Sequence, residues 1–234
     1  MLTPSGYIHA LALGTILWTT LGYKGWTVCV LYLLLGQLVT KIGFQQKTEL
    51  GIAEGRGGRR GPENVWGSAA AGTICTLAAA AASSSSSSSS LFLGLSRDLW
   101  ILGYVASLST KLADTFASEI GKAYGQTTFL ITSLKPVPRG TEGAISLEGT
   151  VASIVGGLLL SSYAYYIVGL LPSVKGVVVS AFAAFVATMI ESVIGATLQG
   201  KKGMSWMTNE VVNFINTVIG AVVAMSLGVL LLGL

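Results

Sequence analysis

The sequence predicts an all-α fold, a polytopic transmembrane bundle of about seven helices that forms one integral membrane domain over residues 1–234. Three observations support this class. The chain is 52% hydrophobic and only 10% charged, and its mean hydropathy is +0.70. Its apolar residues gather in runs of about 20, the length that crosses the hydrocarbon core as a helix. A single soluble domain has too little interior to bury so much apolar surface.

The apolar runs place the expected helices in order along the chain. They cover residues 5–22, 25–43, 65–82, 99–120, 146–171, 174–198 and 211–234. The first run leads directly into the second without a small-residue cleavage site, so we expect a membrane helix there and not a removed signal peptide. Cys29 and Cys75 lie far apart in apolar runs, which favours buried packing residues over a disulfide or a metal site.

Basic residues are distributed unevenly between the two sides that alternating loops would face. One side receives Lys41, Lys47, Arg56, Arg59, Arg60, Lys122, Lys135, Arg139, Lys201 and Lys202, and the other receives Lys24, Arg97 and Lys175. The positive-inside rule therefore predicts a cytoplasmic N-terminus and a C-terminus on the far side. The net charge of +4 reflects this orientation, and we expect membrane lipids but no nucleic acid as partners.

Three connecting segments differ in composition. Residues 44–64 form a basic cytoplasmic loop, residues 83–98 a serine-rich segment, and residues 121–145 a cytoplasmic loop with glycine and basic residues. The eight serines at 83–90 have no side chain large enough to pack specifically. We therefore expect either a flexible linker on the far side at 83–98 or a loosely packed extension of the preceding helix, and we expect the polar features to gather on the cytoplasmic side.

Carboxylates close to the ends of apolar helices are the first indication of a site. Asp114 lies about two turns inside the fourth expected helix, where an ionised carboxylate needs a counter-charge, a metal or a proton. An ion pair with Lys111 is the structural alternative. Glu148 and Glu191 enter the membrane from the same side. Since Lys111 is the only basic residue away from the ends of an expected span, we expect Asp114, Glu148 and Glu191 to bind Mg²⁺, which prefers oxygen ligands.

Small residues follow Asp114 along the helix. Asp114 and Ser118 share one face of the helix, and Ala117, Gly121 and Gly125 continue close to it. Such a strip allows another backbone or a nucleotide to approach closely. Glu119 adds a second acid to this polar segment, A-D-T-F-A-S-E-I-G.

The loop after this helix has the parts of a phosphate-binding site. Glycines in the turn R-G-T-E-G leave backbone amides free to point at an anion, and the N-terminus of the next helix attracts negative charge. Magnesium normally arrives with phosphate, so a ligand that carries phosphate is expected at this loop. The candidate residues of this segment are Lys122, Lys135, Arg139, Gly140, Thr141, Gly143 and Ser146.

Two further polar clusters lie on the same side. Arg56, Arg59 and Arg60 alternate with glycines, and arginine matches the geometry of a phosphate, although anchoring to anionic lipid headgroups is an alternative. Asn209 and Asn213 begin an amide face of the last helix that Asn216 continues. Amides inside a membrane must be satisfied internally, so this face should point toward the carboxylates.

Four motifs in a fixed order resemble the plant and cyanobacterial phytyl-phosphate kinase family from about Lys41 to the C-terminus. They are A-D-T-F-A-S-E-I-G, R-G-T-E-G-A-I-S-L-E-G-T, E-S-V-I-G-A-T-L-Q and T-N-E-V-V-N-F-I-N-T. A more distant likeness to CTP-dependent phytol and dolichol kinases implies a donor site that includes Asp114, Ala117, Gly121, Gly125, Lys135, Gly140, Thr141 and Gly143. The serine run departs from the family pattern. The resemblance implies the plasma or thylakoid membrane of a cyanobacterium-like source.

Residues and resemblance together predict a kinase that transfers the γ-phosphate of CTP or another nucleoside triphosphate to an isoprenyl monophosphate for tocopherol-type or phylloquinone-type lipids. Asp114 would bind the metal, Lys135 and Arg139 the donor phosphates, and the three arginines the acceptor phosphate. Two other functions remain open. A transporter would use the acids and amides as an ion or proton relay, and a lipid-phosphate cytidylyltransferase would also take CTP.

Overall fold

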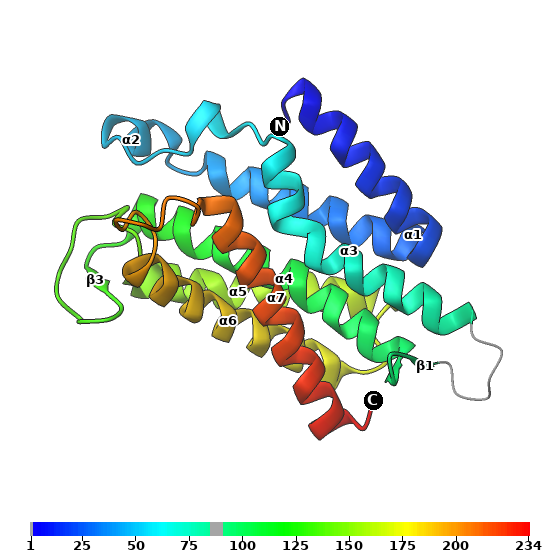
Figure 1. Cartoon of the computed structure of the whole chain (residues 1–234). Helices are drawn as coiled ribbons and strands as arrows, with labels where there is room; N and C mark the ends of the chain where they lie inside the picture. Colours follow the sequence, from blue (N-terminus) through cyan, green and yellow to red (C-terminus); the bar gives the residue numbers. More distant parts are fainter. Residues whose placement is uncertain (1, 85–90) are drawn as a thin grey trace.

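The computed structural model of the chain describes residues 2–84 and 91–234 and confirms the all-α fold class. Long helices run side by side between the two ends of a bundle, as Figure 1 shows. They are α1 (Pro4–Lys41), α3 (Pro62–Ser84), α4 (Arg97–Tyr124), α5 (Leu147–Ser162), α6 (Val174–Thr197) and α7 (Asn209–Leu227). The short helix α2 (Phe44–Glu49) and a 3₁₀ turn (Gly55–Gly58) join α1 to α3, and single π turns extend α5 (Tyr163–Ile167) and α7 (Gly228–Leu232).

Helix α1 is bent sharply at Gly22. This residue has φ 64° and ψ −159°, a conformation that a residue without Cβ adopts readily. The first arm, residues 4–21, runs away from the N-terminus, and the second arm, residues 23–41, returns beside it (Figure 1). The two separate helices predicted at 5–22 and 25–43 are therefore the two arms of one kinked helix.

Helix α4 forms the centre of the bundle. Every residue from 101 to 115 is buried, because α4 packs against α1, α3, α5, α6 and α7. A helix surrounded by protein needs no lipid-facing surface, so α4 accommodates Lys111, Asp114 and several hydroxyl side chains in its second half. Close packing depends on small neighbours. A Cβ on Gly220 of α7 would lie 1.9 Å from Oγ1 of Thr110.

Four helices of the described chain are long and apolar enough to cross a membrane, namely Pro62–Ser83, Leu147–Ile167, Val174–Thr197 and Asn209–Leu232. The two arms of α1 and the central α4 also correspond to predicted spans, but they are not among these four. The physical reason is clearest for α4, whose polar second half is covered by other helices and not by lipid.

Two short antiparallel hairpins lie at opposite ends of the bundle. Strands β1 (Leu91–Phe92) and β2 (Leu95–Ser96) precede α4, and β3 (Thr128–Leu130) pairs with β4 (Ala144–Ser146) ahead of α5. The predicted segment at 83–98 is therefore divided among several elements. Residues 83 and 84 end α3, residues 91–96 form a hairpin, and α4 begins at Arg97. The rest of the predicted serine linker, residues 85–90, lies outside the described residues.

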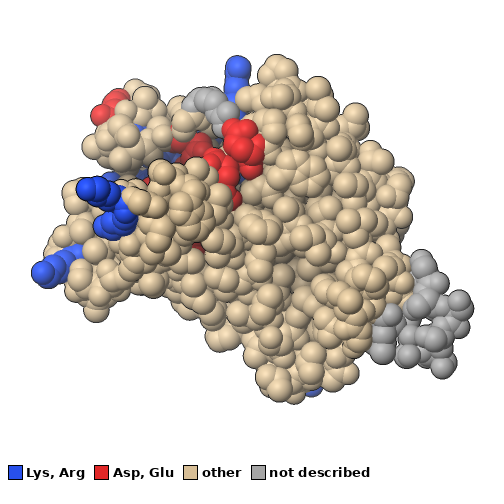
Figure 2. All heavy atoms as spheres, in the orientation of Figure 1, with Lys and Arg blue, Asp and Glu red and all other residues tan. Residues whose placement is uncertain are grey.

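The two chain ends lie at opposite ends of the bundle. The N-terminal segment lies beside the turn before α3, where the Thr3 amide donates to the Arg60 carbonyl at 3.0 Å. The C-terminus lies near β1 (Figure 1). Figure 2 shows that acidic and basic side chains gather at one end of this face, around a hollow, while the rest of the face is almost free of charge. This charged end carries α2, the β3–β4 hairpin and the beginning of α7 (Figure 1).

Candidate functional site

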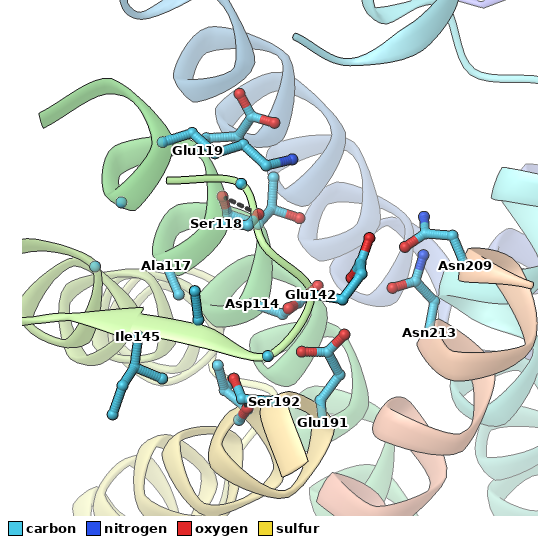
Figure 3. A pocket seen from close by; sticks show the side chains of 18 of the residues that line it. Asp114, Ala117, Ser118, Glu119, Glu142, Ile145, Glu191, Ser192, Asn209 and Asn213 are labelled. Atoms are coloured by element: carbon cyan, nitrogen blue, oxygen red, sulfur yellow. Dashed lines mark hydrogen bonds between the residues drawn. The ribbon is translucent and has the colours of Figure 1, made fainter. Parts of the chain in front are cut away.

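A polar cavity of about 180 Å³ opens at the charged end of the bundle. Its walls come from the beginnings of α3, α5 and α7, the last turns of α4 and α6, and the loop between β3 and β4. These segments are far apart in the sequence, and the bundle brings them together around one space. Figure 3 shows the side chains of Asp114, Glu142, Glu191 and Asn213 directed toward this space.

Helix α4 supplies a buried ion pair to the cavity wall. Asp114 is only 7% exposed, and its Oδ2 accepts a hydrogen bond from the Lys111 ammonium group. Lys111 also donates to Oδ1 of Asn213 on α7 at 2.7 Å. The ion pair that the sequence left open as the structural alternative is therefore present. It holds the Asp114 carboxylate in a defined orientation at the edge of the cavity.

Helices α6 and α7 place an acid and two amides around Asp114. Glu191 of α6 interacts electrostatically with Asp114, Lys111 and Glu142. Asn209 and Asn213 line the cavity, as the predicted amide face requires. Asn216 does not follow them. It is fully buried outside the cavity lining, and within the described part of the chain its amide group has no hydrogen-bond partner.

A second buried ion pair, which the sequence analysis missed, joins α2 to α4. Lys47 is completely buried, and its Nζ contacts the Glu119 carboxylate and the Thr40 carbonyl, the latter at 3.0 Å. From the sequence, Lys47 was interpreted only as one of the basic residues of a cytoplasmic loop. Glu119 could have indicated this ion pair, because a second acid near the end of α4 requires a cation when it is buried.

The glycine turn of the β3–β4 loop closes one side of the cavity. Gly143 has φ 75°, and a Cβ on it would lie 2.5 Å from both the Ser192 carbonyl oxygen and the Ala196 Cβ of α6. The turn therefore rests directly on α6. Beyond it, Oγ of Ser146 caps α5 by accepting from the Gly149 amide at 3.1 Å, which brings the N-terminus of α5 to the cavity.

Gly143→Ala is expected to displace this turn and lower the thermal unfolding midpoint in detergent by more than Gly200→Ala does. Both glycines have a positive φ, but nothing lies within 4 Å of a Cβ on Gly200. Gly200→Ala therefore reports backbone strain alone, about 1–2 kcal/mol, and Gly143→Ala adds overpacking of about 1–3 kcal/mol. Equal midpoints for the two variants would show that the turn does not rest on α6.

The small-residue strip of α4 serves mainly as a packing surface for α5. A Cβ on Gly149 would lie 2.7 Å from the Ala117 carbonyl oxygen, and one on Gly125 would lie 3.0 Å from Oγ of Ser146. Of the two uses that the sequence left open for the strip, close approach of another backbone is the one observed for these residues. Ala117, Ser118 and Gly121 also line the cavity, whereas Gly125 does not.

Several predicted site residues lie outside the cavity lining. They are Arg59, Gly125, Lys135, Arg139 and Glu148, whereas the side chain of Arg56 lies outside the described part of the structure. Lys135 is exposed on the β3–β4 loop. Arg139 donates instead to the Ala123 carbonyl at 3.2 Å, and Glu148 accepts from the Gln126 amide at 3.2 Å. Arg139 thus binds the backbone of the last turn of α4, and Glu148 binds the backbone just after this helix, so neither side chain reaches the cavity.

The predicted site of three metal-binding carboxylates is not formed. Among the described residues, no three His, Cys, Asp or Glu side chains lie close enough to hold a metal ion. Asp114 and Glu191 do line the same cavity. Mg²⁺ is usually bound by one or two carboxylates together with substrate phosphates, so this pair fits Mg²⁺ that arrives with a nucleotide better than an ion held by protein alone.

Acidic side chains outnumber basic ones in the described lining of the cavity. Five acids face three cations there, namely Glu54, Asp114, Glu119, Glu142 and Glu191 against Arg60, Lys111 and Lys122. Lys111 neutralises the charge of Asp114, and Lys47 neutralises that of Glu119. A bare polyanion would meet uncompensated carboxylates, so an anionic ligand is favoured when it brings a cation with it.

Comparisons with known proteins support a membrane family. Residues 1–221 match the family model described as "Integral membrane protein DUF92". The chain is 54% identical over 228 residues to an uncharacterized membrane protein of Synechocystis, covering 97% of this chain and 83% of the relative. It is 42% identical over 223 residues to "Protein VTE6, chloroplastic" of Arabidopsis thaliana, covering 95% and 64%. An uncharacterized membrane protein of Methanocaldococcus jannaschii is 29% identical over 223 residues, covering 95% and 84%. No solved structure matches the chain.

Proposed function

The chain belongs to the integral membrane protein family DUF92, and we propose that it is a membrane kinase that transfers the γ-phosphoryl group of a nucleoside triphosphate, CTP foremost, to an isoprenyl monophosphate such as phytyl phosphate. The family membership agrees with the likeness of its motifs to the phytyl-phosphate kinase family. The observation that carries the proposal is the polar cavity. There, five carboxylates, three cations and a glycine turn beside a helix N-terminus surround one space at the end of an apolar bundle.

The proposed reaction needs positioned charge more than covalent help from the protein. An oxygen of the acceptor phosphate forms a bond to the γ-phosphorus, the bond from that phosphorus to the β–γ bridging oxygen breaks, and the nucleoside diphosphate leaves. The acceptor phosphate is already anionic at neutral pH, so no general base is required. The main task of the site is to neutralise and align two polyanions.

The cations that line the cavity are better placed for this task than Lys135 and Arg139, which were expected from the sequence. We assign Lys111 and Lys122, with the N-terminus of α5, to the donor phosphates in place of Lys135 and Arg139, which lie outside the cavity. Arg60 is assigned to the acceptor phosphate. It is half-buried in the opposite wall, where it donates to the Tyr32 hydroxyl at 2.7 Å.

Asp114 and Glu191 are the residues that would hold Mg²⁺ bound to the donor nucleotide. The ion would supply charge neutralisation at the transferring phosphoryl group. The Lys111 ammonium holds the Asp114 side chain in place for this role, and Oδ1 of Asn213 accepts a second hydrogen bond from the same ammonium group. The cavity lies within the last turns of α4 and α6 and the first turn of α7, at one end of the bundle, where a soluble nucleotide has access.

The function is tested with purified protein in mixed micelles that contain Mg²⁺, phytyl monophosphate and CTP labelled in either the γ- or the α-phosphate. A kinase moves the γ label into a prenyl diphosphate and releases CDP. Incorporation of the α label into lipid, with release of pyrophosphate, would replace the proposal with a cytidylyltransferase. No lipid product with any nucleoside triphosphate would overturn both enzymes in favour of a carrier.

Arg60→Ala is expected to raise the KM for the acceptor about tenfold or more, because it removes the charged hydrogen bonds to the acceptor phosphate. The KM for the nucleotide should change much less. Arg59→Ala is the matched comparison, since Arg59 is exposed outside the cavity lining, and its effect on either KM should stay below about twofold. Equal increases for the two variants, or a larger effect of Arg60→Ala on the nucleotide KM, would contradict the assignment.

A further inference from the structure

A second cavity, apolar and about 580 Å³ in volume, lies between the two arms of α1 and the first half of α3. Its walls include Leu13, Leu17 and Trp18 of the first arm, Val30 and Leu33 of the second arm, and Ala69 of α3. The volume is within the range of about 300–1,000 Å³ that is typical of small-molecule sites. The cleft exists because the kink at Gly22 folds the first arm back beside the rest of the bundle.

The apolar cleft and the polar cavity meet at shared residues. Arg60, Asn64 and Ser68 line both of them. All three lie at or just before the beginning of α3, at the charged end of the bundle. A single molecule can therefore have a polar group in one cavity and an apolar chain in the other.

We propose that this cleft binds the hydrocarbon tail of the lipid phosphate acceptor, with the phosphate at Arg60 and the chain extending along the first arm of α1. The inference rests on the proposed function for the class of the acceptor, an isoprenyl monophosphate. It adds where the tail lies and how the lipid enters.

Arg60 is fixed at the junction of the two cavities. Its guanidinium group donates to the Tyr32 hydroxyl at 2.7 Å and lies 5.6 Å from the centre of the Tyr32 ring. A Cβ on Gly36 would lie 3.0 Å from Nη2 of Arg60, so the small residue leaves room for the side chain. The cation thus stands where the phosphate of an amphipathic ligand would leave the apolar cleft, which matches the charge of the head group.

The first arm of α1 is joined to its neighbours at two points. Near its beginning, Trp66 of α3 donates to Nδ1 of His9 at 2.9 Å. Near its end, the rings of Trp18 and Trp26 meet edge to face with centroids 5.8 Å apart. These contacts fix the position of the first arm along the cleft. Leu11 lines the cleft and is 73% exposed at its edge, so the cleft opens sideways toward the surrounding lipid, from which a membrane-dissolved substrate would enter.

The placement is tested on the wild-type protein, without nucleotide, by photolabelling with a phytyl monophosphate analogue that carries a diazirine at the far end of its chain. Mass spectrometry should locate the label on the first arm of α1, on residues 29–33 or on residues 65–69. Excess phytyl monophosphate should displace it, whereas phytol and a bilayer phospholipid should not. Label on other segments would overturn the proposal. Displacement of the label by phospholipid as effectively as by phytyl monophosphate would also overturn it, because the cleft would then bind lipids in general.

A matched pair of variants on one helix supplies the second test. Ala10 lines the cleft, whereas Ala12 of the same arm is exposed and outside it. Ala10→Phe should narrow the cleft and raise the KM for phytyl monophosphate about tenfold or more, while that for the short dimethylallyl monophosphate stays within about twofold. Ala12→Phe should leave both values unchanged and controls for a bulky ring on this helix.

The two proposals fail in different ways. If the cleft is labelled specifically but the protein transfers no phosphate, the tail-binding proposal stands and the proposed kinase activity is wrong. The effect of Ala10→Phe would then be measured as a loss of labelling. Phosphate transfer that Ala10→Phe and Ala12→Phe affect equally, with label outside the cleft, would overturn the tail site and uphold the kinase.

Discussion

Asp114→Asn is expected to lower the rate of phosphoryl transfer by about 10²–10³-fold or more, because the substitution removes the negative charge that would hold Mg²⁺ opposite Glu191. Asp114 is buried, lines the cavity, and is held by Lys111. The measurement is single-turnover transfer to phytyl monophosphate at saturating nucleotide. Asp98→Asn is the matched control, since Asp98 lies in the first turn of the same helix, at the opposite end of the bundle, and its variant should retain full turnover.

Loss of folding must be separated from loss of chemistry in this experiment. Asp114→Asn leaves the buried Lys111 ammonium without its counter-charge, although Asn213 still accepts a hydrogen bond from it. Breaking such a buried pair costs about 3–5 kcal/mol. Adding Lys111→Met removes the unpaired charge and should recover much of the thermal midpoint without recovering turnover. Normal turnover in Asp114→Asn would remove Asp114 from the proposed site.

Lys47→Met is expected to cause the largest loss of stability, about 3–5 kcal/mol, because it leaves the buried Glu119 carboxylate without its cation. Lys47 is completely buried, and its ammonium group also binds the Thr40 carbonyl, so it fastens α2 to both α1 and α4. In a chain of this length, such a loss corresponds to a thermal midpoint lower by roughly 10 °C in detergent.

The double variant Lys47→Met with Glu119→Gln tests the cause of this loss. With both charges removed, no unpaired ion is buried, and most of the lost stability should return. Lys41→Met controls for removal of an exposed lysine on the neighbouring segment and should change the midpoint little. A double variant that is less stable than Lys47→Met alone would show that the two residues do not act as a pair.

Much of the fold followed from the pattern of apolar residues, because a helix in lipid must be apolar over its whole width and about 20 residues long. This rule located the arms of α1 and helices α3, α5, α6 and α7 within a few residues. It also located α4, but it did not show that α4 is central. The arrangement of a helix among its neighbours depends on which faces fit together, and a nearly uniform apolar surface carries little of that information.

The sequence predicted those site residues that lie inside apolar helices, where a polar or charged side chain is energetically costly. Asp114, Glu191, Asn209 and Asn213 are polar residues near the ends of apolar helices, and the structure places all four around one cavity. The glycine turn at 140–143 reaches the same cavity. The exposed loop residues Lys135 and Arg139 do not. A charged side chain on a loop is stable when it faces solvent, so the sequence alone does not show whether that side chain points into the site.

The sequence by itself determined that this is an integral membrane protein with its polar residues collected at one end, since burial of unpaired charge in lipid is too costly to occur without cause. Only the tertiary structure decided the partners of those residues. It showed Lys111 with Asp114, Lys47 with Glu119, and Arg60 at the point where a polar cavity meets an apolar cleft. Such pairings depend on distances of a few ångströms between segments far apart in the chain, and these distances are set by the packing of all the helices together.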